Sequence, residues 1–191
     1  MLNIHDTNKG NFQCDRLHDE LNRKVVYLGS IQYNTTISGF FSGQCRDDTP
    51  SCIVQPSRAE DVARAVTILV KYGCQSSVKG GGHTPWAGAA SFNGGVTIDM
   101  AKLDTTTLNH DNTVASIGAG SRWGEVYNTL IPTGYVIAGG RDSTVGVGGL
   151  ILGGMLKSRL SIASDGLTVT CRRLLMVCSC PWLCLRLGRE L

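Results

Sequence analysis

The sequence carries little charge of either sign, which argues against a nucleic-acid partner. Charged residues make up 17% of the 191 residues, and the formal net charge is only +3. Because nucleic-acid binding requires a concentrated positive surface, we expect no nucleic-acid partner. Long apolar runs are also lacking. The longest, residues 174–187, is interrupted by Ser179, Pro181 and Arg186 and is too short for an ordinary membrane-spanning helix. We therefore expect a soluble chain without a membrane partner.

The sequence also lacks signals that would fix its cellular compartment. Its opening residues, MLNIHDTNKGNFQ, do not have the charged-then-apolar pattern of a secretory signal. The eight cysteines lack the paired C-x-x-C spacing of a zinc module, so disulfides or thiols are expected and a metal site is not. Localisation and oligomeric state stay open at this point.

A chain of this length can bury one large core, and its composition divides it into three segments. Residues 1–47 are polar and rich in turn formers, and we expect an arm with a short helix at residues 15–22 and an extended stretch at residues 33–41. Residues 48–154 carry the regular hydrophobic patterns of a domain. Residues 155–191 form a divergent tail in which Cys, Arg, Leu and Trp crowd together without periodicity.

Strand and helix patterns follow one another in residues 48–154 and predict an α+β fold with α/β-like strand–helix units. The first predicted helix begins near Ser57 and Glu60, which have capping-box spacing, and ends at Gly73. Its predicted apolar face consists of Val62, Ala65, Val66, Leu69 and Val70. Strands are predicted at residues 52–54, 95–100, 114–117 and 135–138, together with one that ends at residues 78–79, and a second helix is predicted at residues 122–130.

A first glycine cluster, VKGGGHTPWAGAA, occupies residues 78–90. Gly80, Gly81 and Gly82 directly follow a strand, where successive backbone N–H groups can turn toward one point. His83 and Thr84 come next, so an imidazole, a hydroxyl and several amides can converge on a phosphate-bearing cofactor. The motif is neither a Walker loop nor G-x-G-x-x-G. A flexible turn beside a surface histidine is the alternative interpretation.

A second glycine cluster, GGRDSTVGVGGLILGG, occupies residues 139–154. Its glycines alternate with aliphatic residues, which allows either a tight helix crossing or close backbone approach to a flat ligand. The crossing is the commoner explanation for an isolated cluster. Two such clusters in one chain favour the ligand.

Five motifs occur in a fixed order: CIVQPSRAEDVARAV, VKGGGHTPWAGAA, GGVTIDMAKL, SIGAGSRWGEVY and GGRDSTVGVGGLILGG. This ordered set resembles the PCMH-type FAD-binding domain of the vanillyl-alcohol oxidase and berberine-bridge-enzyme-like superfamily, and its fungal members most closely. The resemblance covers about residues 14–154. It implies that the chain contains the N-terminal half of that domain.

The resemblance implies FAD as the cofactor and suggests which residues bind it. The loop of Gly80, Gly81, Gly82, His83 and Thr84 would hold the pyrophosphate, and His83 would bond covalently to the 8α-methyl group of the isoalloxazine ring. Some relatives carry a second link through a Cys at the position of Asp142, so only one link is expected here. Further cofactor contacts are implied at Gly140, Thr144, Gly146, Gly148, Gly149, Leu150 and Gly153.

The activity implied by the resemblance is that of an oxidase. Such an enzyme passes a hydride from an alcohol, sugar or secondary metabolite to the His-linked flavin and then passes the electrons to oxygen. Relatives carry a further substrate domain that supplies the catalytic base, and no base can be assigned here. Two alternatives stay open: a noncatalytic truncated fragment, or noncovalent FAD binding as in the flavin subunits of molybdenum hydroxylases.

The resemblance also suggests a disulfide between Cys14 and Cys74, as in secreted relatives. Beyond Gly154 the likeness to the family is lost. The tail is interpreted as a thiolate metal cluster, a buried apolar segment, or the product of a shifted reading frame or mispredicted exon, and the last is favoured. Four of the cysteines lie in this tail, at Cys171, Cys178, Cys180 and Cys184.

Overall fold

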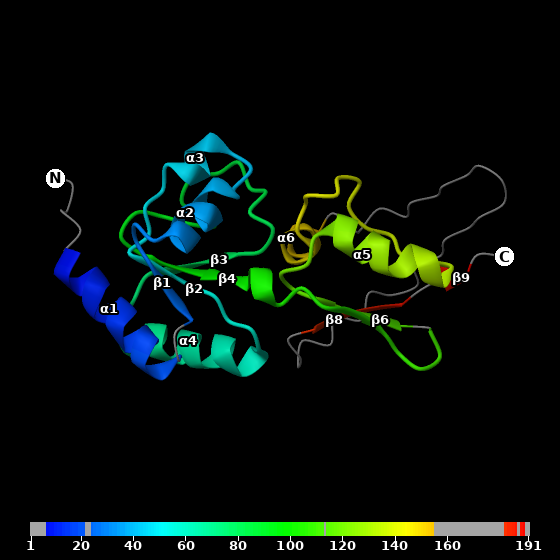
Figure 1. Cartoon of the computed structure of the whole chain (residues 1–191), viewed down its shortest axis with the longest axis horizontal. Coiled ribbons are helices and arrows are strands. Elements are labelled where there is room, and N and C mark those ends of the chain that lie inside the picture. The colour runs from blue at the N-terminus through cyan, green and yellow to red at the C-terminus, as the bar shows by residue number, and fades with distance from the viewer. Residues whose placement is uncertain (1–6, 22–23, 113, 155–181, 187, 190–191) are drawn as a thin grey trace. The chain divides into compact units, whose positions relative to one another are not determined.

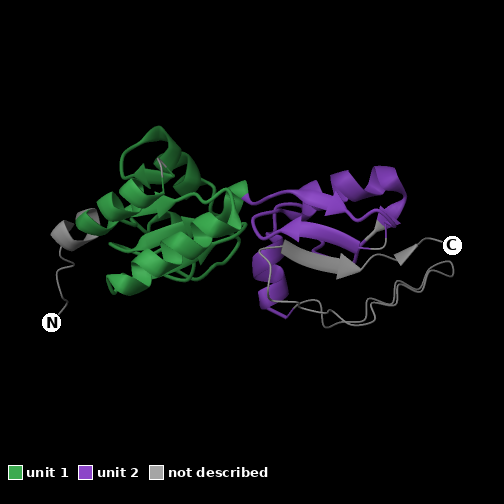
Figure 2. Cartoon of the chain, turned by 90° about the horizontal axis from the view of Figure 1, so that it is seen from below, with its two compact units in different colours: residues 1–102 green, residues 103–191 purple. Residues whose placement is uncertain are grey.

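The computed structural model describes residues 7–21, 24–112, 114–154, 182–186 and 188–189. The chain forms two compact units, residues 1–102 and residues 103–191, coloured separately in Figure 2. Both units combine helices with strands (Figure 1), which confirms the expected α+β class. Within the described ranges, no helix is long and apolar enough to cross a bilayer.

The first unit is built on a four-stranded sheet of order β1-β2-β4-β3. Strand β1 (Val25–Tyr27) runs antiparallel to β2 (Cys52–Val54), whereas β4 (Val96–Asp99) is parallel to both β2 and β3 (Ser76–Lys79). Strands β2 and β4 are buried along their whole length, as expected of central strands covered on both faces of the sheet. The register ends with Lys79 beside Asp99, and the first glycine cluster leaves the sheet from this carboxyl end.

Two helices enclose the main core of this unit on one face of the sheet (Figure 1). Helix α1 (Thr7–Glu20) and helix α4 (Ala59–Lys71) contact each other and the strands. Leu17 of α1, Leu69 of α4 and Ile98 of β4 are all buried in this core. Packing of an apolar helix stripe on a sheet supplies most of the stability of such a layer.

Two short helices, α2 (Ile31–Ser38) and α3 (Gly43–Arg46), lie over the other face of the sheet (Figure 1). Tyr33 of α2 packs against Val26 and Ile53 in a second cluster. Burial raises the pKa of Tyr33 to about 12, and its hydroxyl donates to the Pro50 carbonyl at 2.8 Å.

The leading segment differs from its predicted form. Residues 33–41 are not extended, because α2 covers most of them and the Ser30 hydroxyl caps its first turn. The expected arm is instead part of the sheet unit: it contributes β1 to the sheet, and it buries Leu17 and Leu21 in the core. The helix predicted at residues 15–22 begins earlier, at Thr7.

The cap of α4 is also displaced from its predicted position by one residue. Arg58, not Ser57, is the N-cap, and Asp61, not Glu60, closes the box by accepting from the Arg58 amide at 3.1 Å. Burial alone would raise the pKa of Asp61, but hydrogen bonds from the Lys24 ammonium and from the Ser57 and Arg58 amides outweigh it and lower that pKa.

The predicted apolar face of α4 is correct only in part. Ala65 and Leu69 are buried, whereas Val66 and Val70 are 45% and 75% exposed. Gly73 adopts a φ of +60° and ends the helix as predicted.

The disulfide in this unit joins Cys14 to Cys52, so the predicted pairing of Cys14 with Cys74 is wrong. Cys14 lies on the buried side of α1, and its Cα is 6.0 Å from that of Cys52 on β2. Cys74 is partly buried against the same core at the end of α4.

The second unit contains an antiparallel sheet of order β5-β6-β8. Strand β6 (Val114–Gly118) lies between β5 (Thr106–Leu108) and β8 (Trp182–Arg186). A smaller pair joins β7 (Tyr135–Val136) to β9 (Gly188–Arg189). The predicted strand at residues 114–117 is confirmed, and that at residues 135–138 is shorter.

Helix α5 (Trp123–Leu130), followed by the 3-10 turn Ile131–Thr133, and helix α6 (Val147–Leu152) complete this unit. Trp123 is fully buried, and it packs with Ile117 of β6 and with the first residue of α6. Most of the tail, residues 155–181, lies outside the described residues, and so do the interpretations of Cys171, Cys178 and Cys180. No group of His, Cys, Asp or Glu side chains in the described ranges could hold a metal ion.

Candidate cofactor-binding site

The first glycine cluster forms a tight turn at the carboxyl end of β3. Gly82 adopts a φ of +70°, and a Cβ at this position would lie 3.1 Å from Lys79 Cε and 3.3 Å from Phe40 Cδ1. Glycine is therefore required here for its conformation and for its small size. The Gly82 carbonyl accepts a hydrogen bond from the Phe41 amide at 2.9 Å, which fixes the turn.

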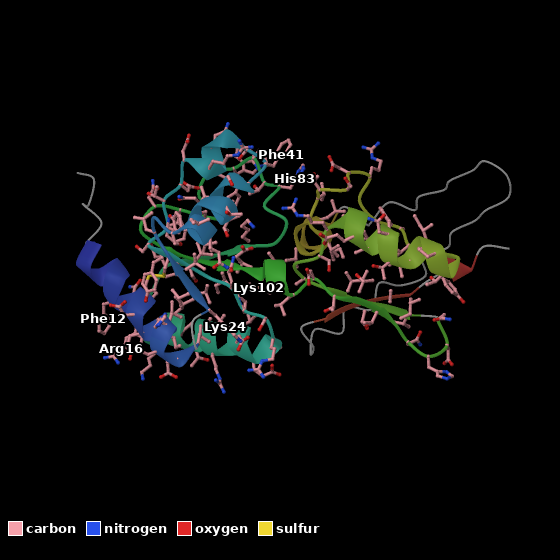
Figure 3. All side chains as sticks on the ribbon, viewed as in Figure 1. Phe12, Arg16, Lys24, Phe41, His83 and Lys102 are labelled. Carbon is pink, nitrogen blue, oxygen red and sulfur yellow. A yellow bond between two sulfur atoms is a disulfide. The ribbon has the colours of Figure 1, made fainter. Side chains whose placement is uncertain are left out.

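His83 follows this turn and lies against one aromatic ring. Its imidazole stacks on Phe41 with ring centroids 4.1 Å apart and planes inclined by 16° (Figure 3). Its Nε2 atom is buried and has no hydrogen-bond partner among the described residues. A buried polar atom without a partner is uncommon, so this nitrogen is a candidate contact for a ligand.

The segment after His83 is held by the α2–α3 region. The Thr84 carbonyl accepts hydrogen bonds from the Ser42 hydroxyl at 3.2 Å and from the Cys45 thiol at 3.4 Å. The same thiol lies 3.2 Å from the Trp86 carbonyl. Residues distant in sequence thus fix the backbone on both sides of His83.

A buried ion pair supports the base of the loop. Lys79 Nζ lies 3.1 Å from Asp99 Oδ1, and the two side chains are 5% and 2% exposed. The other Asp99 oxygen accepts from Gln55 Nε2 at 3.3 Å, and that amide also contacts the Thr36 hydroxyl at 3.2 Å. The ammonium lies 5.4 Å from the Phe40 ring centroid. This network joins β3, β4, the residue after β2 and α2, and the Lys79 side chain lies next to Gly82.

The second glycine cluster lies in the other unit, and several of its glycines face protein. A Cβ on Gly140 would lie 2.5 Å from the buried Trp123 ring, and one on Gly148 would lie 2.8 Å from the Ala119 carbonyl. The Gly140 carbonyl accepts from the Tyr127 hydroxyl at 2.8 Å, and burial raises the pKa of that phenol. Packing alone therefore accounts for glycine at these two positions.

The remaining predicted residues of this cluster surround the start of α6. Gly146 is the N-cap of the helix, and Gly149 is exposed with no atom within 4 Å of an added Cβ. Leu150 is partly buried and Gly153 is exposed at the C-cap. The Thr144 hydroxyl donates to Asp142 Oδ1 at 2.7 Å, so in this structure it is engaged within its own turn.

Comparison with known proteins identifies the family. The sequence profile of the FAD-binding domain matches residues 50–171, which is more than half of the chain. The chain belongs to the FAD-binding domain family. The match confirms the resemblance seen in the five motifs, and it continues past Gly154, where the likeness was expected to end.

Fungal proteins are similar to this chain over most of its length. The FAD-dependent monooxygenase sdcF of Emericella nidulans is 38% identical over 143 residues, which cover 74% of this chain and 30% of that protein. The FAD-dependent monooxygenase tpcD of Cochliobolus heterostrophus is 39% identical over 123 residues, covering 64% and 24%. The chain thus spans less than a third of the length of these relatives.

Solved structures share the FAD-binding fold. Glucooligosaccharide oxidase from Acremonium strictum, described with a 6-S-cysteinyl, 8α-N1-histidyl FAD, has a TM-score of 0.64 and 27% identity and covers 74% of this chain and 30% of its own. 6-Hydroxy-D-nicotine oxidase from Arthrobacter nicotinovorans has a TM-score of 0.60 and 26% identity, covering 66% and 27%. A BBE-like protein from Physcomitrella patens, with a TM-score of 0.61 and 24% identity over 72% of this chain and 30% of its own, shares the fold.

The residues present in this FAD-binding domain fit the cofactor at the first cluster. A glycine turn follows a strand there, and next comes an imidazole whose buried nitrogen has no partner in the part of the chain that the structure describes. The structure brings Gly80, Gly81, Gly82, His83 and Thr84 together in the first unit, and the second-cluster residues lie in the second unit.

Sequence reasoning missed the residues that support His83, namely Phe41, Cys45, Lys79 and Asp99. The signals available were weak. Asp99 is a carboxylate at the end of an apolar strand, and Phe41 is an aromatic residue in a segment otherwise rich in polar residues.

Proposed function

We propose that this chain is the FAD-holding part of a flavin-dependent oxidoreductase and that His83 bonds covalently to the flavin. Residues 80–84 would bind the pyrophosphate with their backbone amides, and His83 would meet the 8α position of the ring system. Bound FAD supplies hydride acceptance from a small molecule, such as an alcohol, sugar or secondary metabolite, with oxygen as the final electron acceptor. The names of the fungal monooxygenases and of the oxidases support this class of chemistry.

The observation that carries this proposal is the buried Nε2 of His83 at the end of the glycine turn, which has no hydrogen-bond partner within the described ranges. Nearby polar groups are paired by protein: the Thr84 carbonyl accepts from Ser42, and Lys79 pairs with Asp99. Among these groups, the imidazole is the one that has a buried atom without a hydrogen-bond partner in the described residues. Cofactor contacts at Gly140, Thr144, Gly146, Gly148, Gly149, Leu150 and Gly153 belong to the same proposal.

Expression of the full chain with FAD, followed by acid precipitation, tests the attachment. We expect a yellow pellet whose flavin fluorescence is retained in the wild type and lost in His83→Ala. His110→Ala is a matched control, because its ring is fully exposed at the surface.

Other results would contradict the attachment. Flavin released from the wild type by acid would support noncovalent binding instead. A colourless wild type without a cooperative melting transition would support a noncatalytic fragment.

A further inference from the structure

We propose that Phe41 is a positioning residue that holds the His83 imidazole in the plane needed for flavin attachment. This inference rests on the function proposed above. Phe41, labelled beside His83 in Figure 3, contacts the histidine by stacking. The Phe41 residue is 60% exposed. Its large exposed apolar surface contributes little to the core, so fold stability alone does not explain an aromatic residue here.

The backbone of Phe41 is fixed independently of its ring. Arg46 Nε donates to the Phe40 carbonyl at 2.8 Å, and the Arg46 terminal nitrogen donates to the Phe41 carbonyl at 3.0 Å. The Phe41 amide donates to Gly82 at 2.9 Å. Three hydrogen bonds therefore fix the backbone from which the Phe41 ring extends toward His83.

The imidazole needs such a support because hydrogen bonding does not orient its buried nitrogen. Nε2 of His83 has no partner in the described part of the chain. Histidines that react or bind metals are usually oriented by a hydrogen bond on the ring. Here the ring of Phe41, inclined by 16° to the imidazole, takes the place of such a hydrogen bond and restricts rotation of the imidazole plane.

Attachment joins an imidazole nitrogen of His83 to the 8α carbon of the flavin. One hydrogen leaves the 8α-methyl group and one leaves the imidazole N–H. Their two electrons and two protons pass to molecular oxygen, which becomes hydrogen peroxide. Phe41 takes no part in the bond changes. Its contribution is the fraction of time that the imidazole spends in the reactive orientation.

The test follows covalent flavin formation in full-length apo-protein after addition of FAD and oxygen, by acid-stable flavin absorbance over time. We expect Phe41→Leu to slow attachment about tenfold, the upper range of an aromatic pair, and Phe41→Tyr to restore it. Phe12→Leu is the matched control, because Phe12 is 48% exposed and contacts Tyr72 instead. Melting temperatures of all variants establish that they are folded.

Two further measurements separate positioning from a general structural role. In a His83→Ala background, Phe41→Leu should leave the Kd for FAD unchanged. Without FAD, the ring protons of His83 should lose their upfield NMR shift in Phe41→Leu. If Phe41→Leu attaches flavin at the wild-type rate, the positioning role is wrong while the attachment proposal stands. The same follows if Phe41→Leu weakens FAD binding in the His83→Ala background as much as it slows attachment. A wild type without acid-stable flavin overturns the attachment proposal, and the positioning role with it.

Discussion

Removal of the positive partner from the buried pair beneath the glycine turn should destabilise the first unit strongly. Lys79 and Asp99 are 5% and 2% exposed, and their charged atoms are 3.1 Å apart. In Lys79→Met the Asp99 carboxylate stays buried, with neutral donors from Gln55 and the Ala101 amide, both at 3.3 Å. An uncompensated buried charge of this kind costs about 3–5 kcal/mol in the free energy of unfolding.

The double variant Lys79→Met/Asp99→Leu tests whether this cost comes from the unpaired charge. Without the carboxylate, the Gln55 amide keeps Thr36 as a partner, and the Ala101 amide belongs to an exposed residue, so the remaining penalty is about 1–3 kcal/mol. The double variant should therefore be more stable than Lys79→Met alone. Arg58→Met is the control, because Arg58 is 67% exposed and 3.7 Å from its carboxylate, and exposed pairs contribute about 0–1 kcal/mol.

Guanidinium unfolding followed by far-UV circular dichroism measures these differences, provided that the m-value is shared by the variants. Covalent flavin content of the same proteins reports on the turn above the pair. A Lys79→Met variant within about 1 kcal/mol of the wild type would refute the reasoning, since that is the scale of an exposed pair. A double variant whose loss of unfolding free energy equals the sum of the losses in Lys79→Met and in Asp99→Leu, each made alone, would refute it as well.

Three more outcomes are expected. Gly82→Ala should lower stability by about 1–2 kcal/mol for its left-handed φ alone and reduce flavin attachment, whereas Gly43→Ala, with open space around its Cβ, should do neither. Replacement of Cys14 and Cys52 by Ser should cost about 4 kcal/mol, since their disulfide closes a loop of 38 residues, and thermal melting with thiol alkylation checks this. The pKa of Asp61 is lowered in the folded state, so its carboxylate stabilises the fold at pH values above its ordinary pKa of about 4. This stability is lost as the pH falls through the folded pKa, so acid unfolding of Asp61→Asn should show a weaker pH dependence.

The sequence predicted the elements whose patterns are local. Strands β2, β4 and β6 and helices α4 and α5 follow from apolar runs and periodicity. Helix α2 was missed because its residues, IQYNTTIS, are polar or β-branched and bury only Tyr33 and Thr36. Its signals were the caps Ser30 and Gly39, which pattern reading of the interior overlooks.

The candidate site divides in the same way. His83 and the glycines before it belong to one continuous motif, so the sequence alone singled them out. Phe41 and Asp99 reach the loop through tertiary structure, since one follows α2 and the other ends a neighbouring strand. The pairing of Cys14 with Cys52 could not be derived from cysteine count, because several connectivities fit one sequence.

The two glycine clusters look alike in the sequence, but the structure separates their physical causes. Position 82 needs glycine for its left-handed φ. Positions 140 and 148 need glycine because Trp123 and the Ala119 carbonyl occupy the space that a side chain would fill. Of the predicted second-cluster glycines, Gly149 is exposed and has open space around it. If the second cluster contacts FAD, Gly149→Ala should therefore weaken FAD binding without loss of fold stability. Gly148→Ala should lower both FAD affinity and fold stability. Equal effects of the two substitutions on stability would show that packing does not distinguish these positions.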